Sequence, residues 1–227
     1  MLFCSWAAFV LVSGGRCSAL PREPSVQGAE SREARCKIVY LGIVGALEVA
    51  NNSHSGIVQI RETLSQPEYP DVCAKTFTPY VWRSGLRYVL NHFPSHAGVL
   101  TPEELQCAPK VILVGHSMGG WAVLSVARQL KSRDIPVELS IQVDSVGITD
   151  ETVPSNVKAA AIFHARDILT LITTKKIRAE EPDKTRLIAN VLVRGAGHES
   201  VTRDPRIREM VMNLVARLRG ATLVPAS

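Results

Sequence analysis

From residue 37 onward, the chain alternates short apolar runs with longer segments of mixed character. The apolar runs are nearly continuous, and they predict strands over residues 37–41, 72–77, 110–114, 137–143, 157–163 and 188–193. The mixed segments place apolar residues at helical spacing, and they predict helices over residues 55–64, 82–92, 119–131 and 204–219. Strands without polar alternation are typical of a parallel sheet covered on both faces. The pattern therefore predicts a single α/β domain over residues 37–220, with a mostly parallel central sheet and helices on both faces.

The first 36 residues follow a different pattern. Residues 2–12 are apolar apart from Ser5, and Cys17-Ser18-Ala19 resembles a small-x-small cleavage site. We therefore expect residues 1–19 to be a secretory signal peptide, although no Lys or Arg precedes the apolar stretch. Residues 20–36 are polar and read as a flexible leader. The protein is then secreted or exported, and it is cytoplasmic if the N-terminus is not a signal.

Composition narrows the classes of partner. The 227 residues carry a formal net charge of +5, but the basic residues are scattered and form no stripe interleaved with aromatic residues. Nucleic-acid binding is therefore not expected. No apolar run reaches the ~20 residues of a membrane-spanning helix, so no stable span is expected.

One motif carries candidate chemistry. Gly115-His116-Ser117-Met118-Gly119 follows an apolar strand directly and begins a helix. In this setting a serine lies on a sharp turn, and glycines leave room for the chain that passes close by. Free N–H groups at the helix start, that of Met118 among them, suit the stabilisation of an oxyanion. We interpret Ser117 as a nucleophile, and His116 as a packing or turn residue because the turn directs Oγ away from its neighbours.

With this motif and Gly195-Ala196-Gly197-His198, the chain resembles the α/β-hydrolase fold family, in its small, cap-less lipase, esterase and thioesterase group. The resemblance implies an α/β-hydrolase fold and a Ser-His-Asp triad in that chain order. It implies His198 as the base, in a loop after the last strand. For the acid it leaves Asp144 and Asp167, each of which follows a predicted strand. Asp144 is preferred because its segment resembles one in lipase-like hydrolases, although those more often have proline where this chain has Ser145.

The resemblance has two further implications. The second oxyanion donor should follow the first family-type strand, which points to the backbone N–H of Ile43. The fold also places the strands after Cys36 and Cys107 side by side, so a disulfide between these residues is a geometric possibility, with Cys73 as the competitor.

The sequence thus predicts a serine hydrolase that cleaves carboxylic esters, lipid-like or short, through an acyl-enzyme. The partner is a small-molecule acyl substrate, with no cofactor and no metal. The alternatives are a thioesterase or acyltransferase that uses the same triad, and a non-catalytic binding protein with the hydrolase fold.

Overall fold

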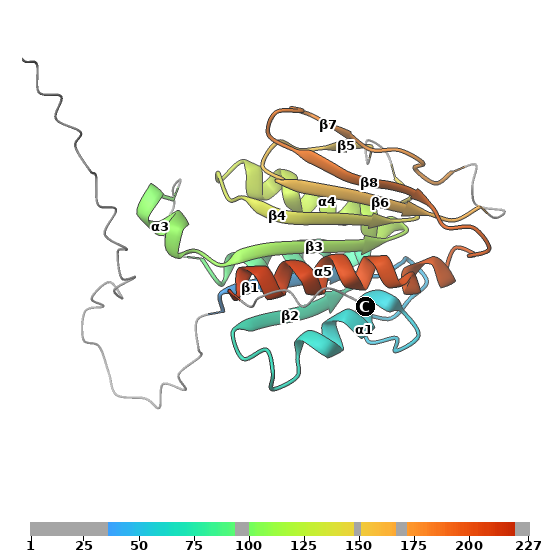
Figure 1. Cartoon of the computed structure of the whole chain (residues 1–227), viewed down its shortest axis with the longest axis horizontal. Helices are drawn as coiled ribbons and strands as arrows, with labels where there is room; N and C mark the ends of the chain where they lie inside the picture. The colour runs from blue at the N-terminus through green and yellow to red at the C-terminus, as the bar shows by residue number, and fades with distance from the viewer. Residues whose placement is uncertain (1–35, 94–99, 148–150, 167–171, 221–227) are drawn as a thin grey trace, which may run out of the picture. The chain divides into compact units, whose positions relative to one another are not determined.

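The computed structural model describes residues 36–93, 100–147, 151–166 and 172–220. Six parallel strands form the central sheet, in the order β2-β1-β3-β4-β6-β8 (Figure 1). The strands are β1 (Ile38–Ile43), β2 (Val72–Phe77), β3 (Lys110–His116), β4 (Val137–Val143), β6 (Ala159–His164) and β8 (Arg186–Leu192). All six correspond to predicted apolar runs, and every strand end lies within two residues of the predicted one. The predicted α/β class with a parallel sheet is confirmed.

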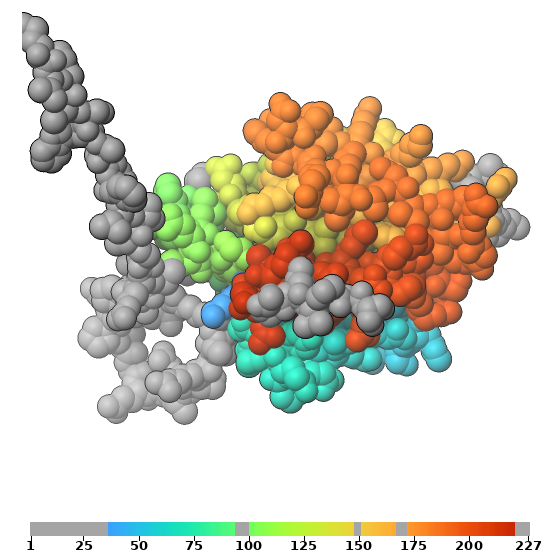
Figure 2. Space-filling model, in the orientation of Figure 1, coloured from blue at the N-terminus to red at the C-terminus, as the bar shows by residue number. Residues whose placement is uncertain are grey.

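Helices cover both faces of this sheet. The helices α1 (Gly56–Leu64) and α5 (Pro205–Leu218) pack on one face, and α2 (Trp82–Leu90) and α4 (Met118–Lys131) pack on the other. In Figure 1, α5 and α1 lie in front of the strands and α4 lies behind them. Figure 2 shows the side chains of α5 packed against those of α1 on the near face.

The alternating direction of side chains along each strand explains why the core has two layers, one on each face of the sheet. In β1, Val39 and Leu41 belong to the core under α2 and α4, whereas Ile38 and Tyr40 belong to the core under α1 and α5. Successive strand residues point to opposite faces, so a strand covered on both sides must be apolar throughout. Each fully buried aliphatic side chain contributes about 1.5–3 kcal/mol relative to an exposed one.

The strand order changes direction at one point. From β1 the chain adds β2 on one side, then returns to place β3 on the other side, with β4, β6 and β8 beyond it. The connections after β1 and β3 therefore diverge above neighbouring strands. In open parallel sheets, ligands bind outside the carboxyl ends of the strands at such a switch point. The site is thus expected above the ends of β1 and β3, where Ser117 follows β3.

Several short elements were not predicted. A short helix, α3 (Pro102–Cys107), begins with a capping box between Thr101 and Glu104. A second parallel sheet consists of β5 (Thr152–Val153) and β7 (Arg178–Ala179). Two-residue strands are too short for any periodicity to appear in the sequence. The helix predicted over 82–92 ends at Leu90 instead.

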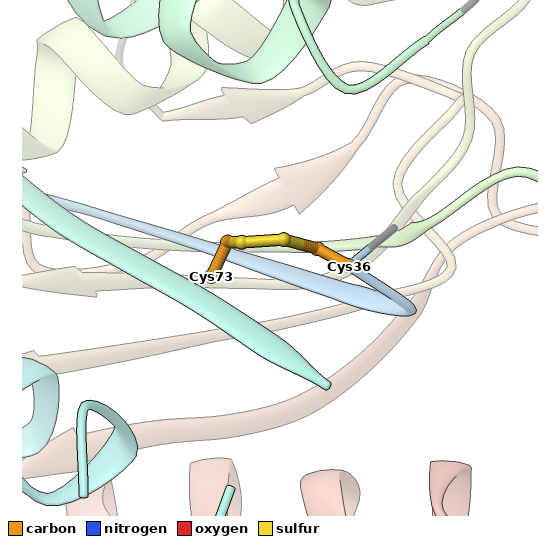
Figure 3. Close-up of a disulfide and its surroundings, with 2 residues drawn as sticks. All are labelled: Cys36 and Cys73. Atoms are coloured by element: carbon orange, nitrogen blue, oxygen red, sulfur yellow. A yellow bond between two sulfur atoms is a disulfide. The ribbon is translucent and has the colours of Figure 1, made fainter. Parts of the chain in front are cut away.

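The disulfide differs from the pair considered first. Cys36 is bonded to Cys73, with Cα atoms 5.6 Å apart (Figure 3), so the bond is to the competing cysteine. Both β2 and β3 are neighbours of β1, which made two pairings possible. Cys73 lies within β2 in register with Val39, three residues after Cys36, whereas Cys107 ends α3.

The proposed signal peptide (1–19) and nearly all of the leader (20–36) lie outside the described residues. Within the described part of the chain, no helix combines the length and apolarity needed to cross a bilayer.

Candidate active site

Ser117 occupies a strained turn between β3 and α4. Its backbone has φ 53° and ψ −127°, a left-handed region that non-glycine residues rarely adopt. Its N–H donates to Val143 O (2.9 Å), and its carbonyl accepts from Gly120 N–H (2.9 Å) and Val146 N–H (3.1 Å). These bonds hold the strained conformation, as is common at functional sites. The hydroxyl makes no capping hydrogen bond to α4, so it is not an ordinary helix cap.

Glycines beside the serine are required by close backbone contact. A Cβ on Gly115 would lie 2.1 Å from Gly119 O, and a Cβ on Gly119 would lie 2.1 Å from Ile43 O. The start of α4 therefore packs directly on the ends of β3 and β1. Any larger residue at either position would push Ser117 away from the sheet edge.

His198 and Asp144 are joined at the same edge. Nδ1 of His198 lies 2.6 Å from Oδ2 of Asp144. Because a carboxylate only accepts, Nδ1 carries the proton. In the neutral ring, the lone pair is then on Nε2. His198 follows β8 in the Gly195-Ala196-Gly197 loop, and its side chain is 16% exposed.

Asp144 is fixed by the two strands that flank it. It follows β4 with φ 43°, and it is 1% exposed. Its N–H donates to Phe163 O (2.6 Å), and its Oδ1 accepts from Ala165 N–H (3.0 Å). One carboxylate oxygen is thus held by the chain after β6, and the other faces His198. The alternative acid, Asp167, lies outside the described residues.

His116 brings His198 next to the serine turn. Its Nε2 lies 2.8 Å from the carbonyl oxygen of His198, and the two ring centroids are 4.6 Å apart. The residue that precedes Ser117 is therefore hydrogen-bonded to the backbone of His198. This buried side chain packs and hydrogen-bonds as the sequence analysis expects of it.

The sequence analysis missed Glu48. Its carboxylate is hydrogen-bonded to Nδ1 of buried His116, and it also accepts from Gly45 N–H (2.9 Å). Burial acts to raise the pKa of Glu48, but the hydrogen bonds and charge of His116 and the Gly45 N–H outweigh it, so the pKa is lowered. The only signal in the sequence was an acid in an otherwise apolar stretch, Val44 to Ala50.

The two predicted oxyanion donors lie at neighbouring positions in the fold. Met118 is the first residue of α4, where backbone N–H groups have no partner within the helix. Ile43 is the last residue of β1, in register with Phe77 and Gly115. The backbone N–H groups of the two residues after Ile43 already have acceptors. Val44 N–H donates to Phe77 O (3.0 Å), and Gly45 N–H donates to the Glu48 carboxylate (2.9 Å).

Two kinds of surface lie on the segments that follow the strands. Large apolar side chains are exposed in the segments that follow β1, β2 and β6; they are Leu47, Val49, Tyr80, Val81 and Ile172. A separate hollow is lined by Arg166, Leu192, Arg194 and Gly195, beside the loop that carries His198. Among the described residues, neither arginine forms a salt bridge or a side-chain hydrogen bond.

Potential metal ligands gather away from this edge. Cys36, Cys73 and His92 place their ligand atoms within 4.8 Å of one another. The two sulfurs are bonded to each other, whereas metal binding requires thiolates. This group does not suit a metal while the disulfide is intact.

Comparison with known proteins gives distant structural likenesses. No protein-family model and no curated protein sequence matches the chain. The RedJ thioesterase from the prodiginine biosynthetic pathway in Streptomyces coelicolor is 11% identical, with a TM-score of 0.47, covering 85% of this chain and 91% of that one. Est1E from Butyrivibrio proteoclasticus is 13% identical, with a TM-score of 0.45, covering 84% and 91%. A cutinase-like protein from Cryptococcus sp. is 13% identical, with a TM-score of 0.43, covering 84% and 98%. At these identities, function has to be argued from the residues of this chain.

Proposed function

We propose that this protein is a serine hydrolase that cleaves carboxylic esters through an acyl-enzyme, with Ser117 as nucleophile, His198 as base and Asp144 as acid. The observation that carries the proposal is the 2.6 Å contact between His198 Nδ1 and Asp144 Oδ2. The 2.8 Å contact between His116 Nε2 and the His198 carbonyl oxygen links this pair to the residue before Ser117, whose φ is positive. A buried carboxylate that fixes the tautomer of a histidine next to a strained serine is the arrangement that activates a hydroxyl.

The chemistry follows from the protonation of the ring. Because Nδ1–H donates to Asp144, Nε2 of His198 is the atom that takes the proton of Ser117 Oγ as Oγ attacks the substrate carbonyl carbon. The tetrahedral intermediate collapses when the leaving oxygen takes that proton from Nε2. Water then attacks the acyl-enzyme by the same route and releases the acid. Asp144 stabilises the transient imidazolium throughout.

The developing oxyanion requires backbone donors near Oγ. We assign one to Met118 N–H at the start of α4, where the helix dipole adds positive potential. The other comes from the chain after β1, with Ile43 N–H as the candidate. Losing one such donor typically lowers the rate by about 10²–10³-fold.

The exposed apolar side chains in the segments that follow β1 and β2 favour an acyl group as the recognised part of the substrate. Leu47 and Val49 flank Glu48 after β1, and they are 96% and 63% exposed. Tyr80, which follows β2, is 68% exposed. Exposed apolar side chains near the carboxyl ends of the strands are typical of sites that bind apolar ligands. Lipid-like or short acyl esters fit this surface.

The hollow between Arg166 and Arg194 favours thioester cleavage as a second candidate. The imidazole protonates the leaving group, so the leaving group must approach from the side of the His198 loop. Two guanidinium groups on that side suit a leaving group that carries phosphates, because guanidinium binds phosphate in a bidentate manner. The acyltransferase and non-catalytic alternatives are outcomes of the experiment below.

Turnover of p-nitrophenyl esters of increasing chain length tests the proposal. Wild-type protein should release p-nitrophenol, and Ser117→Ala should lose this activity while it keeps its circular dichroism spectrum. Product analysis with and without an added alcohol separates hydrolysis from acyl transfer. A folded wild-type protein that cleaves neither esters nor thioesters would favour the binding-protein alternative.

Export of the protein is a separate proposal that rests on residues 1–19. N-terminal sequencing of material from the growth medium tests it, and the expected start is Leu20.

A further inference from the structure

Two histidine–carboxylate pairs meet at the sheet edge, and only one of them belongs to the triad. Asp144 holds the ring of His198. Glu48 holds His116, and His116 in turn contacts the backbone of His198. The side chains of Glu48 and His116 are 5% and 1% exposed, so this second pair cannot reach a substrate from solvent. The Glu48–His116 pair must therefore have a role other than contact with the substrate.

The direction of the hydrogen bonds shows what the pair holds. The carbonyl oxygen of His198 can only accept, so Nε2 of His116 carries a proton and donates it. On the other side of the ring, Nδ1 is hydrogen-bonded to the Glu48 carboxyl group. Gly45 N–H donates to the same oxygen of Glu48. A continuous chain of hydrogen bonds therefore runs from the end of β1 to the loop that carries His198.

Packing around Gly45 leaves this arrangement little freedom. A Cβ on Gly45 would lie 2.8 Å from Glu48 Oε1 and 3.1 Å from His116 Nδ1. Glycine at this position allows the backbone N–H to approach the carboxylate while the imidazole packs alongside. Both histidines thus have an orientation set by a buried acid.

We propose that Glu48 and His116 are positioning residues, which hold the backbone of His198 so that its imidazole faces Ser117. The proposal rests on the proposed function, and it adds two residues to it. Asp144 fixes the rotation of the imidazole, and the Glu48–His116 pair fixes the location of the loop. The loop needs such support because Gly195 and Gly197 leave its backbone permissive.

Two substitutions of His116 separate its two contacts. An asparagine amide nitrogen occupies about the position of Nδ1, so His116→Asn keeps the contact with Glu48 and loses the one with His198. A glutamine amide nitrogen occupies about the position of Nε2, so His116→Gln keeps the contact with His198. We expect His116→Asn to lower kcat by about 10–100-fold with KM unchanged, since small misplacements of catalytic groups have effects of this size. His116→Gln should restore most of the rate.

Glu48→Gln weakens the same chain from the other end, and it should lower kcat in the same direction. Glu138→Gln is the matched control, because Glu138 pairs with Lys158 (2.7 Å) near the amino end of β4, at the opposite edge of the sheet. The control should leave kcat unchanged. The proposal is overturned if His116→Asn keeps wild-type kcat, or if His116→Gln and His116→Asn lose activity equally.

A readout without catalysis keeps this test independent of the proposed function. Amide hydrogen exchange over residues 195–200 should be faster in His116→Asn and Glu48→Gln than in wild type and Glu138→Gln. If wild-type protein has no hydrolase activity but the exchange changes as expected, the proposed function fails and the structural part of the proposal stands. Unchanged exchange in both variants overturns the proposal whatever the activity.

Discussion

His198 Nδ1 and Asp144 Oδ2 lie 2.6 Å apart, although the two residues are 54 positions apart in the sequence. The contact depends on the backbone of Asp144, which leaves β4 at φ 43° with its N–H bonded to Phe163 O. Strand pairing between β4 and β6 thus aims a buried carboxylate at the loop after β8. The sheet itself determines which aspartate meets the histidine.

Asp144→Asn should lower kcat by about 10⁴-fold, the effect of the equivalent change in serine proteases, where the amide stabilises the wrong histidine tautomer. Asp167→Asn is the matched comparison, and it should retain activity. Steady-state kinetics with one p-nitrophenyl ester measures both. The opposite ranking would assign the acid to Asp167.

Arg166→Gln combined with Arg194→Gln should lower kcat/KM for an acyl-coenzyme A by about tenfold or more, because charged hydrogen bonds contribute about 1.5–3 kcal/mol each. The N-acetylcysteamine thioester of the same acyl chain carries no phosphate, and its cleavage should not change. Equal losses on both substrates would mean that the arginines do not recognise phosphate.

Removing the disulfide should destabilise the fold. Cys36 and Cys73 are separated by 37 positions, and closing a loop of this length stabilises by about 4 kcal/mol in the chain-entropy model. Cys73→Ser should therefore lower Tm by about 10 °C in a domain of this size. The double variant Cys36→Ser/Cys73→Ser should show little further loss. An unchanged Tm in the single variant would contradict the pairing.

The lowered pKa of Glu48 should appear as a pH-dependent stability. A carboxyl whose pKa is lower in the folded than in the unfolded state stabilises the fold above its ordinary pKa, and this contribution is lost as the pH falls through the folded value. The Tm difference between wild type and Glu48→Gln should therefore be largest near neutral pH and shrink in acid. A difference that grows toward acid pH would contradict the assignment of a lowered pKa.

Local sequence patterns predicted the strands, helices and site residues whose signal lies in residues adjacent in the sequence. The sequence predicts Ser117 as nucleophile because its strand, glycines and helix are contiguous, and His198 as base because a glycine-rich loop follows the last strand. Glu48 was missed because its meaning depends on His116, 68 positions later. The Cys36–Cys73 bond joins the chain before β1 to the neighbouring strand β2, and no local pattern encodes which neighbour of β1 offers the cysteine.

The central claim is that the Ser117 hydroxyl is activated by His198. Reaction of the folded protein with a fluorophosphonate probe, followed by peptide mass mapping, tests it most directly. We predict a single adduct on Ser117 that forms with wild-type protein and is lost in His198→Ala, while Glu138→Gln labels normally. Folded wild-type protein that takes no label, or a label on Ser117 that forms equally fast in His198→Ala, would contradict the claim.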